Sequence, residues 1–193
     1  MHKKGKPLLI NLFGAPGAGK STGAAYVYAL LKMAGINAEL ITEFAKDLTW
    51  EHNSKALANQ VYVLGNQYHR ITRCEDEVDV IITDSPLLLS DLYCKDEQIA
   101  NTLSQLTYNA FAKYDSLNYY IKRSKKYNPN GRNQNEEESD EIAGRCLTLL
   151  NNWDLDYKTV SGDIHGYENI FKDAFGYLMS KRLSTINKSK EED

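Results

Sequence analysis

The architecture of this chain follows from the segment Gly14-Ala15-Pro16-Gly17-Ala18-Gly19-Lys20-Ser21-Thr22. It fits the pattern G-x-x-x-x-G-K-[ST], in which the backbone N–H groups of a glycine-rich loop surround phosphate. The apolar residues 7–13 before it predict a buried strand, and the residues after it predict a helix that ends near Gly35. A glycine-rich turn with a surface lysine is the alternative. Because strand, loop and helix coincide, we expect a nucleotide-binding phosphate loop at residues 14–22.

The residue types of this loop suit a polyphosphate and a metal ion. Lys20 supplies a mobile ammonium group for the β- and γ-phosphates, and the Ser21 hydroxyl is placed to ligate Mg²⁺. The helix that opens near Lys20 adds the positive end of its dipole and its unpaired N–H groups. We therefore expect ATP and magnesium as cofactors.

Length and composition indicate one water-soluble domain. The chain has 193 residues, of which 42% are hydrophobic, so residues 1–193 suffice for a single domain with its own core. We expect a disordered tail at residues 185–193. The net charge of −3 gives no general attraction to nucleic acid, and no apolar run approaches the ~20 residues that cross a membrane. Three cysteines far apart in sequence predict free thiols and a cytoplasmic location.

Apolar runs and helical periodicities alternate along the rest of the chain. Such alternation predicts a three-layer α/β fold with a five-stranded parallel sheet and helices on both faces, as in phosphate-loop NTPases. Residues 47–52 are expected as a connection. Further strands are expected at residues 36–41, 78–83, 117–122 and 157–160, and further helices near 54–73, 96–110, 136–152 and 167–183.

Two carboxylates follow predicted strands, and ligands of such sheets bind at the carboxyl ends of the strands. Asp84 closes an apolar strand, as the Walker-B aspartate does, and we expect it to hold Mg²⁺ with Ser21. A turn aspartate before Ser85-Pro86 is the alternative. Glu43, after the second strand, is the candidate that orients or deprotonates an attacking hydroxyl. A solvated loop glutamate is its alternative, and Asp47 is a weaker competitor.

A basic segment follows the fourth predicted strand. Residues 122–132 contain five cations together with Pro, Asn and Gly, which predicts a loop. We expect residues 123–135 to form a basic lid that excludes water and neutralises charge in the transition state. Arg123 and Arg132 are the preferred catalytic cations because a guanidinium grips phosphate with two hydrogen bonds. Lys126 is a substrate-binding candidate, and a solvated basic connection is the alternative for the whole segment.

Three polar side chains of the predicted helix 54–73 are further candidates. Gln60, Gln67 and Arg70 could reach the base or sugar of an acceptor from one side of this helix. Ordinary surface polarity of a helix explains them almost equally well.

These features resemble the nicotinamide-riboside-kinase-like group, whose members are often labelled AAA-type ATPase domains and are frequently encoded by phages. The resemblance spans residues 7–180 and includes the phosphate loop, Glu43, Thr83-Asp84-Ser85 and the lid pattern Tyr127-x-x-x-Gly131-Arg132-x-Gln134-x-Glu136-Glu137. It implies phosphorylation of a hydroxyl on a nucleoside, a nucleotide or a related small molecule, with a modified base in phage DNA as a further acceptor. A fainter likeness to deoxynucleoside kinases rests on Glu43 followed by Trp50, but Asp84-Ser85-Pro86 stands where an acidic-Arg-Ser motif is expected.

The leading hypothesis is therefore an ATP- and Mg²⁺-dependent kinase for a small nucleoside- or nucleotide-like acceptor. A second hypothesis is an ATPase whose hydrolysis drives or regulates a protein or nucleic-acid partner, and a third is a nucleotide-binding regulator without turnover. A GTPase switch is disfavoured because no Asn-Lys-x-Asp motif occurs. The sequence leaves open the identity of the acceptor, ATP against GTP, and a monomer against a homodimer.

Overall fold

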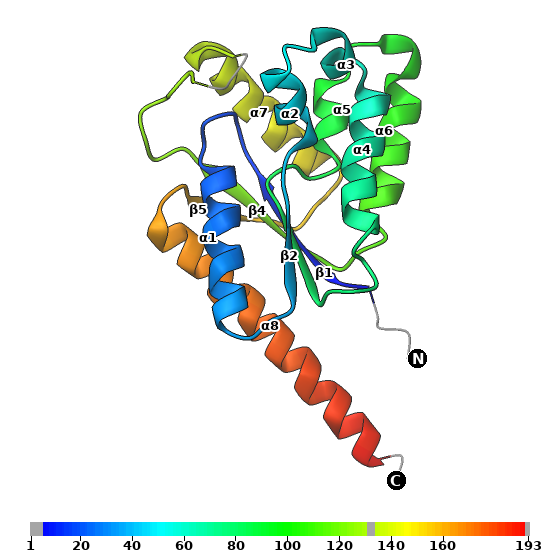
Figure 1. Cartoon of the computed structure of the whole chain (residues 1–193), viewed down its shortest axis with the longest axis vertical. Coiled ribbons are helices and arrows are strands. Elements are labelled where there is room, and N and C mark those ends of the chain that lie inside the picture. The colour runs from blue at the N-terminus through cyan, green and yellow to red at the C-terminus, as the bar shows by residue number, and fades with distance from the viewer. Residues whose placement is uncertain (1–5, 131–133, 192–193) are drawn as a thin grey trace.

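A single parallel sheet forms the centre of the protein in a computed structural model, which describes residues 6–130 and 134–191 (Figure 1). The strands are β1 (Leu8–Phe13), β2 (Ala38–Ile41), β3 (Val80–Thr83), β4 (Ser116–Lys122) and β5 (Lys158–Ser161). Their order is β2-β3-β1-β4-β5, and all four pairings are parallel. The predicted five-stranded parallel α/β fold is confirmed.

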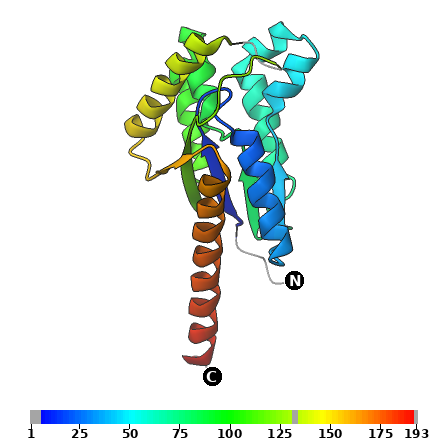
Figure 2. The ribbon, with the colours of Figure 1, turned by 90° about the vertical axis from the view of Figure 1, so that its left-hand side faces the viewer.

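Helices cover both faces of this sheet. On one face lie α1 (Lys20–Met33) and α8 (Ile164–Glu191), which pack against each other and face the viewer in Figure 2. On the other face lie α4 (Gln60–Thr72), α5 (Leu89–Tyr93), α6 (Glu97–Phe111) and α7 (Glu136–Asn152). Two short helices, α2 (Phe44–Trp50) and α3 (Ser54–Ala58), lie beyond the carboxyl end of β2, at the same end of the sheet as the phosphate loop (Figure 1).

The central strand β1 explains the two-sided core. Successive side chains of a strand point to opposite faces of a sheet. Leu8, Ile10 and Leu12 accordingly pack with the α1 and α8 side, while Leu9 and Phe13 pack with the helices of the opposite face. Every residue of β1 is buried, as expected for a parallel strand with helices on both sides.

The region after β2 differs from expectation. Residues 47–52, expected as a connection, contain most of helix α2. The helix expected at residues 54–73 is divided into α3 and α4 at Asn59, whose backbone is extended and whose side chain accepts a hydrogen bond from the Tyr62 N–H. Asn53 caps α3 in the same way through the Ala56 N–H. Asparagine favours such caps because its amide oxygen replaces a missing helical acceptor, and this local chemistry outweighs continuous helix formation.

The bounds of the later helices agree only in part with those predicted from the sequence. Helix α7 has the predicted bounds, whereas α5 was not predicted. Helix α8 runs to residue 191, through most of the segment expected to be a disordered tail, and no Gly or Pro interrupts it after Gly176. All three cysteines are free thiols, as predicted.

Candidate active site

The phosphate loop has a backbone that only glycine adopts without strain. Gly14 and Gly19 have φ values of 137° and 104°. A Cβ atom on Gly14 would lie 2.7 Å from the Ile121 carbonyl oxygen, and one on Gly19 would lie 2.4 Å from the Tyr167 hydroxyl oxygen. Both the conformation and the close approach of neighbouring groups therefore require glycine at these two positions.

Neighbouring elements hold this loop from outside. The Ser139 hydroxyl of α7 donates a 2.8 Å hydrogen bond to the Pro16 carbonyl, and the Tyr167 hydroxyl of α8 donates a 2.9 Å bond to the Gly19 carbonyl. Ser139 and Tyr167 are themselves buried. These bonds tie the loop to helices on both faces of the sheet, so its shape is set by the fold.

Lys20 lies against the loop that it follows in sequence. Its ammonium group donates hydrogen bonds to the carbonyl oxygens of Gly14 (2.9 Å) and Ala15 (3.0 Å). The positive charge is therefore held at the loop where an anion would be bound.

Asp84 and Ser21 supply oxygen atoms that suit a magnesium ion. Asp84 directly follows β3, is only 3% exposed, and its Oδ1 atom has no hydrogen-bond partner among the described residues. A buried carboxylate oxygen without a partner is costly, and a bound cation would compensate for it. The Ser21 hydroxyl is exposed at the start of α1. Within the described residues there is no group of three or more His, Cys, Asp or Glu side chains that could hold a metal ion.

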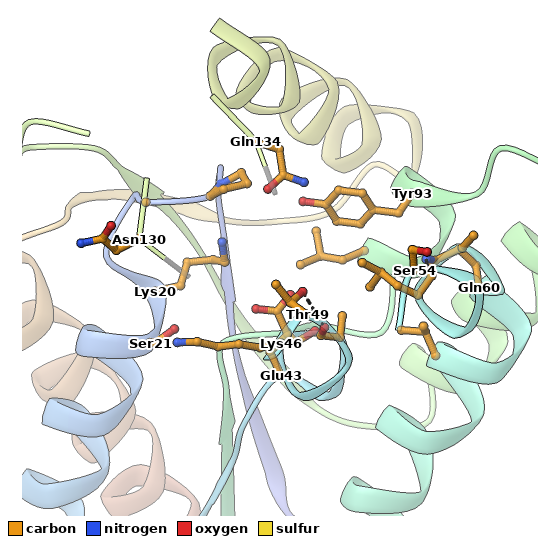
Figure 3. Close-up of a pocket in the computed structure, with 18 of the residues that line it drawn as sticks. Lys20, Ser21, Glu43, Lys46, Thr49, Ser54, Gln60, Tyr93, Asn130 and Gln134 are labelled. Carbon is orange, nitrogen blue, oxygen red and sulfur yellow. Dashed lines mark hydrogen bonds between the residues drawn. The ribbon is translucent and has the colours of Figure 1, made fainter. Parts of the chain in front are cut away.

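A cleft of about 490 Å³ extends from the phosphate loop to the short helices beyond β2 (Figure 3). Its residues come from the phosphate loop and α1, from α2 to α5, and from the segments before and after α5 and before α7. They are Pro16, Gly17, Gly19, Lys20, Ser21, Thr22, Glu43, Ala45, Lys46, Thr49, Ser54, Leu57, Ala58, Gln60, Val63, Ser85, Leu89, Tyr93, Lys95, Asn130 and Gln134.

Glu43 lies in this cleft immediately before α2. Burial raises the pKa of its carboxyl group, the charge of Lys20 acts in the opposite direction, and Asp84 raises the pKa further. A carboxylate in such surroundings gains a proton more readily than an ordinary glutamate. Glu43 and Lys20 thus line the same cleft.

The two glutamines predicted as substrate-binding residues have different surroundings. Gln60 lines the cleft, and its amide nitrogen donates to the Leu57 carbonyl at 2.9 Å. Gln67 is 2% exposed and is not among the lining residues. Its amide oxygen accepts from the Phe44 N–H (2.9 Å), and its nitrogen lies 3.3 Å from the Thr42 carbonyl oxygen. Gln67 thus holds the backbone on both sides of Glu43.

Arg70 contacts α2 and the residue before Glu43, and it does not line the cleft. Its guanidinium pairs with Asp47, lies 3.3 Å from the Thr42 carbonyl oxygen, and is centred 5.2 Å from the centre of the Phe44 ring. Asp47, the competitor of Glu43, is thereby engaged in an ion pair. The prediction that Arg70 faces an acceptor is not supported by these contacts.

The expected lid contributes different residues from those predicted. Arg123 donates to the Ser139 hydroxyl at 3.3 Å and pairs with Asp140, and neither it nor the exposed Lys126 is among the lining residues of the cleft. Asn130 and Gln134 do line it. Arg132 lies outside the described residues.

Sequence reasoning missed several polar side chains of the cleft, above all Lys46. Lys46 lies on α2, and Tyr93, which also lines the cleft, lies on α5; neither helix was predicted. Burial raises the pKa of Tyr93, and the charge of Glu43 raises it further, so its phenol stays neutral. Recognition of α2 as a helix would have shown that Lys46 lies in its first turn, which begins directly after Glu43.

Comparison with known families agrees with this geometry. A family model described as an AAA domain matches residues 9–166, which include the phosphate loop, Glu43 and Asp84. The chain belongs to this AAA-domain family. No curated protein matches this AAA-domain chain. Within the described residues, none of its helices is both long and apolar enough to span a bilayer.

Several solved structures resemble the AAA-domain chain at low sequence identity. A deoxyadenosine kinase from M. mycoides with bound dATP has a TM-score of 0.56 at 20% identity, over 88% of this chain and 98% of that one. The same enzyme with the products dCMP and dCDP gives 0.54 at 18% identity, over 89% and 99%. The APS kinase of Mycobacterium tuberculosis gives 0.40 at 18% identity, over 76% and 99%. The two deoxyadenosine kinase structures show that the AAA-domain chain has a P-loop kinase-like fold.

Proposed function

We propose that this protein is an ATP- and Mg²⁺-dependent kinase that transfers the γ-phosphoryl group to a hydroxyl of a nucleoside- or nucleotide-like small molecule. The observation that carries the proposal is the continuity of the cleft, which joins the phosphate loop to a chamber between α2, α3, α4 and α5. Its volume of about 490 Å³ falls in the range of small-molecule sites. A domain that only hydrolyses ATP needs no such chamber beside the phosphates.

The donor half of the reaction uses the phosphate loop. The loop amides and Lys20 hold the β- and γ-phosphates, and Ser21 with Asp84 would hold Mg²⁺, which neutralises charge on the bridging oxygens. The unpartnered Asp84 oxygen supports this metal assignment. Because the loop is fixed by its neighbours, little reorganisation accompanies the transfer.

Glu43 acts as the general base for the acceptor hydroxyl. The acceptor hydroxyl oxygen forms a bond to the γ-phosphorus as the bond between that phosphorus and the β–γ bridging oxygen breaks, and ADP leaves. The hydroxyl proton passes to the Glu43 carboxylate. The raised pKa of Glu43 and its place in the cleft beside Lys20 and Asp84 support this assignment.

The far end of the chamber suits a planar, partly apolar acceptor. Leu57, Val63 and Leu89 supply apolar walls, and Tyr93 supplies a neutral aromatic ring. The amide nitrogen of Gln60 donates a hydrogen bond to the Leu57 carbonyl, so the amide oxygen of Gln60 remains as a hydrogen-bond acceptor for an N–H group of the substrate. The fold likeness to an enzyme named for deoxyadenosine agrees with a nucleoside-like acceptor.

The test is acceptor-dependent transfer of label from γ-labelled ATP. The wild-type protein, the Lys20→Ala variant and the Lys32→Met control are incubated with Mg²⁺ and a panel of nucleosides, nucleotides and DNA. Lys32 lies exposed in the last turn of α1 and does not line the cleft. We expect label on a small acceptor with the wild type and the control, and none with Lys20→Ala. Phosphate release that depends on a macromolecular partner, without a labelled acceptor, would instead establish an ATPase.

A further inference from the structure

A cation beside Glu43 lines the cleft in addition to Lys20 and Lys95. Lys46 lies on α2, three residues after Glu43, and lines the cleft while remaining exposed to solvent. In Figure 3 its side chain points across the cleft toward Ser21, away from the end of the chamber where Ser54 and Gln60 lie. It makes no hydrogen bond or ion pair with any residue in the described part of the chain.

Three other cations around the cleft are already engaged, while Lys95, after α5, lines the cleft as an exposed lysine. Lys20 donates to two carbonyl groups of the phosphate loop, Arg70 pairs with Asp47, and Arg123 pairs with Asp140. The turn after β3 contributes Asp84, Ser85 and Pro86 and therefore no positive charge. Lys46 is thus a cation of the described cleft that could engage a ligand without breaking an existing bond.

The backbone that carries Lys46 is anchored on both sides of this residue. Before it, the Phe44 N–H donates to the Gln67 amide oxygen at 2.9 Å, and after it, Asp47 is paired with Arg70. Only the side chain of Lys46 is therefore left to move. A lysine on a fixed helical turn can reach a phosphoryl group as that group passes from donor to acceptor, without a closing movement of the lid.

The charge of Lys46 acts on the carboxyl group of Glu43. The charged groups that act on Glu43 are Lys20 from α1, Asp84 after β3, and Lys46 and Asp47 from α2. Lys46 favours the ionised form of Glu43, which opposes the effect of burial. Lys46 and Glu43 also line the same cleft and are three residues apart in the chain.

We propose that Lys46 is a catalytic residue whose ammonium group binds the γ-phosphoryl oxygens as they move from ADP to the acceptor. The inference rests on the proposed function, since it assigns a role within the same transfer. Lys46 donates hydrogen bonds and keeps its proton throughout, while the acceptor proton goes to Glu43. Hydrogen-bond donors that act on charge developing in the transition state contribute about 10²–10³-fold to the rate.

The test compares Lys46→Met, Lys46→Arg and the exposed Lys32→Met control in two assays. The first measures steady-state transfer to the acceptor identified for the wild type. The second needs no acceptor: it measures the affinity for Mg²⁺-ADP alone and for Mg²⁺-ADP with aluminium fluoride, which mimics a transferring phosphoryl group. Thermal unfolding of each variant verifies that it is folded, which we expect because Lys46 is exposed.

For Lys46→Met we expect about a 10²–10³-fold loss of kcat, with the KM for ATP and for the acceptor changed by less than about threefold. The gain in affinity from aluminium fluoride should fall by a similar factor, with ADP affinity unchanged. Lys46→Arg should restore both to within about tenfold of wild type, because it keeps the charge.

Unchanged kcat and aluminium-fluoride affinity in Lys46→Met would overturn the role of Lys46, and so would a loss confined to the KM of the acceptor. Failure of the wild type to phosphorylate any acceptor would overturn the proposed function, yet the aluminium-fluoride assay would still decide the role of Lys46. A wild-type protein that binds no nucleotide would overturn both.

Discussion

Replacing Gln67 by methionine removes the hydrogen bonds that position the backbone around Glu43 and leaves the side-chain volume nearly unchanged. Gln67 accepts from the Phe44 N–H at 2.9 Å and donates to the Thr42 carbonyl at 3.3 Å, with a longer contact of 3.5 Å to the Thr83 hydroxyl. The Thr83 hydroxyl in turn accepts from the Ser85 N–H at 3.1 Å. Gln67 therefore connects the segments that follow β2 and β3.

The loss follows from the number and quality of these bonds. A net contribution of about 1 kcal/mol for each hydrogen bond, together with the cost of leaving buried partners unpaired, gives about 2–3 kcal/mol of lost stability. For a domain of this size each kcal/mol lowers Tm by about 2–4 °C, so Tm should fall by about 4–12 °C. Activity should fall as well, because Glu43 is no longer held, whereas ATP affinity should change little because Gln67 does not contact the phosphate loop.

Thermal and urea unfolding measure the first effect, and nucleotide titration with steady-state kinetics measures the second. The matched control is Gln98→Met, since Gln98 is an exposed glutamine of α6 and lies outside the cleft. A Gln67→Met protein as stable as the control, with unchanged kcat, would refute the idea that Gln67 positions the acceptor side. A loss confined to ATP affinity would refute it as well.

Three further predictions address the chemistry, the phosphate loop and the lid. Because burial raises the pKa of Glu43, kcat/KM should rise with pH through a pKa above that of an ordinary glutamate, and the Glu43→Gln variant should lack this rise. The same raised pKa stabilises the folded protein below the pKa of an ordinary glutamate. This stabilisation is lost as pH rises through the raised pKa of Glu43. Gly162→Ala would place a Cβ atom 2.2 Å from the carbonyl oxygen of Ala18 in the phosphate loop, so calorimetric titration should find ATP binding weakened at least about tenfold. The control is Gly176→Ala, which has open space around the added Cβ atom and should bind ATP as the wild type does. Asn135→Ala removes the capping box of α7 and should cost about 1 kcal/mol in urea unfolding, and a cost near zero would mean that the cap is redundant.

Sequence patterns were sufficient for the parts of the site that depend on the order of strands. The phosphate loop could be recognised because an apolar strand, glycines and a helix coincide within residues 7–34. Glu43 and Asp84 could be assigned to the same edge because the carboxyl ends of parallel strands meet there. These inferences need no knowledge of how helices pack.

The rest of the cleft depends on packing that the sequence does not reveal. Gln60 and Gln67 are seven residues apart and share a helix face, yet one lines the cleft and the other is buried beneath α2. Helices α2 and α5 have seven and five residues, too few for a clear hydrophobic period, so neither helix was predicted and Lys46 was missed. Arg123 is held by residues of α7 that follow it by 16 or 17 positions, which composition alone could not indicate.

The most direct measurement is a crystal structure of the protein with Mg²⁺ and a non-hydrolysable ATP analogue. We predict that the β- and γ-phosphates lie within residues 14–22 with the Lys20 ammonium moved from the loop carbonyls onto phosphate oxygens, and that the metal contacts Ser21 and, directly or through water, Asp84. The chamber beside Glu43 should remain open for an acceptor. An analogue bound elsewhere, or an adenine base that fills this chamber, would contradict the account.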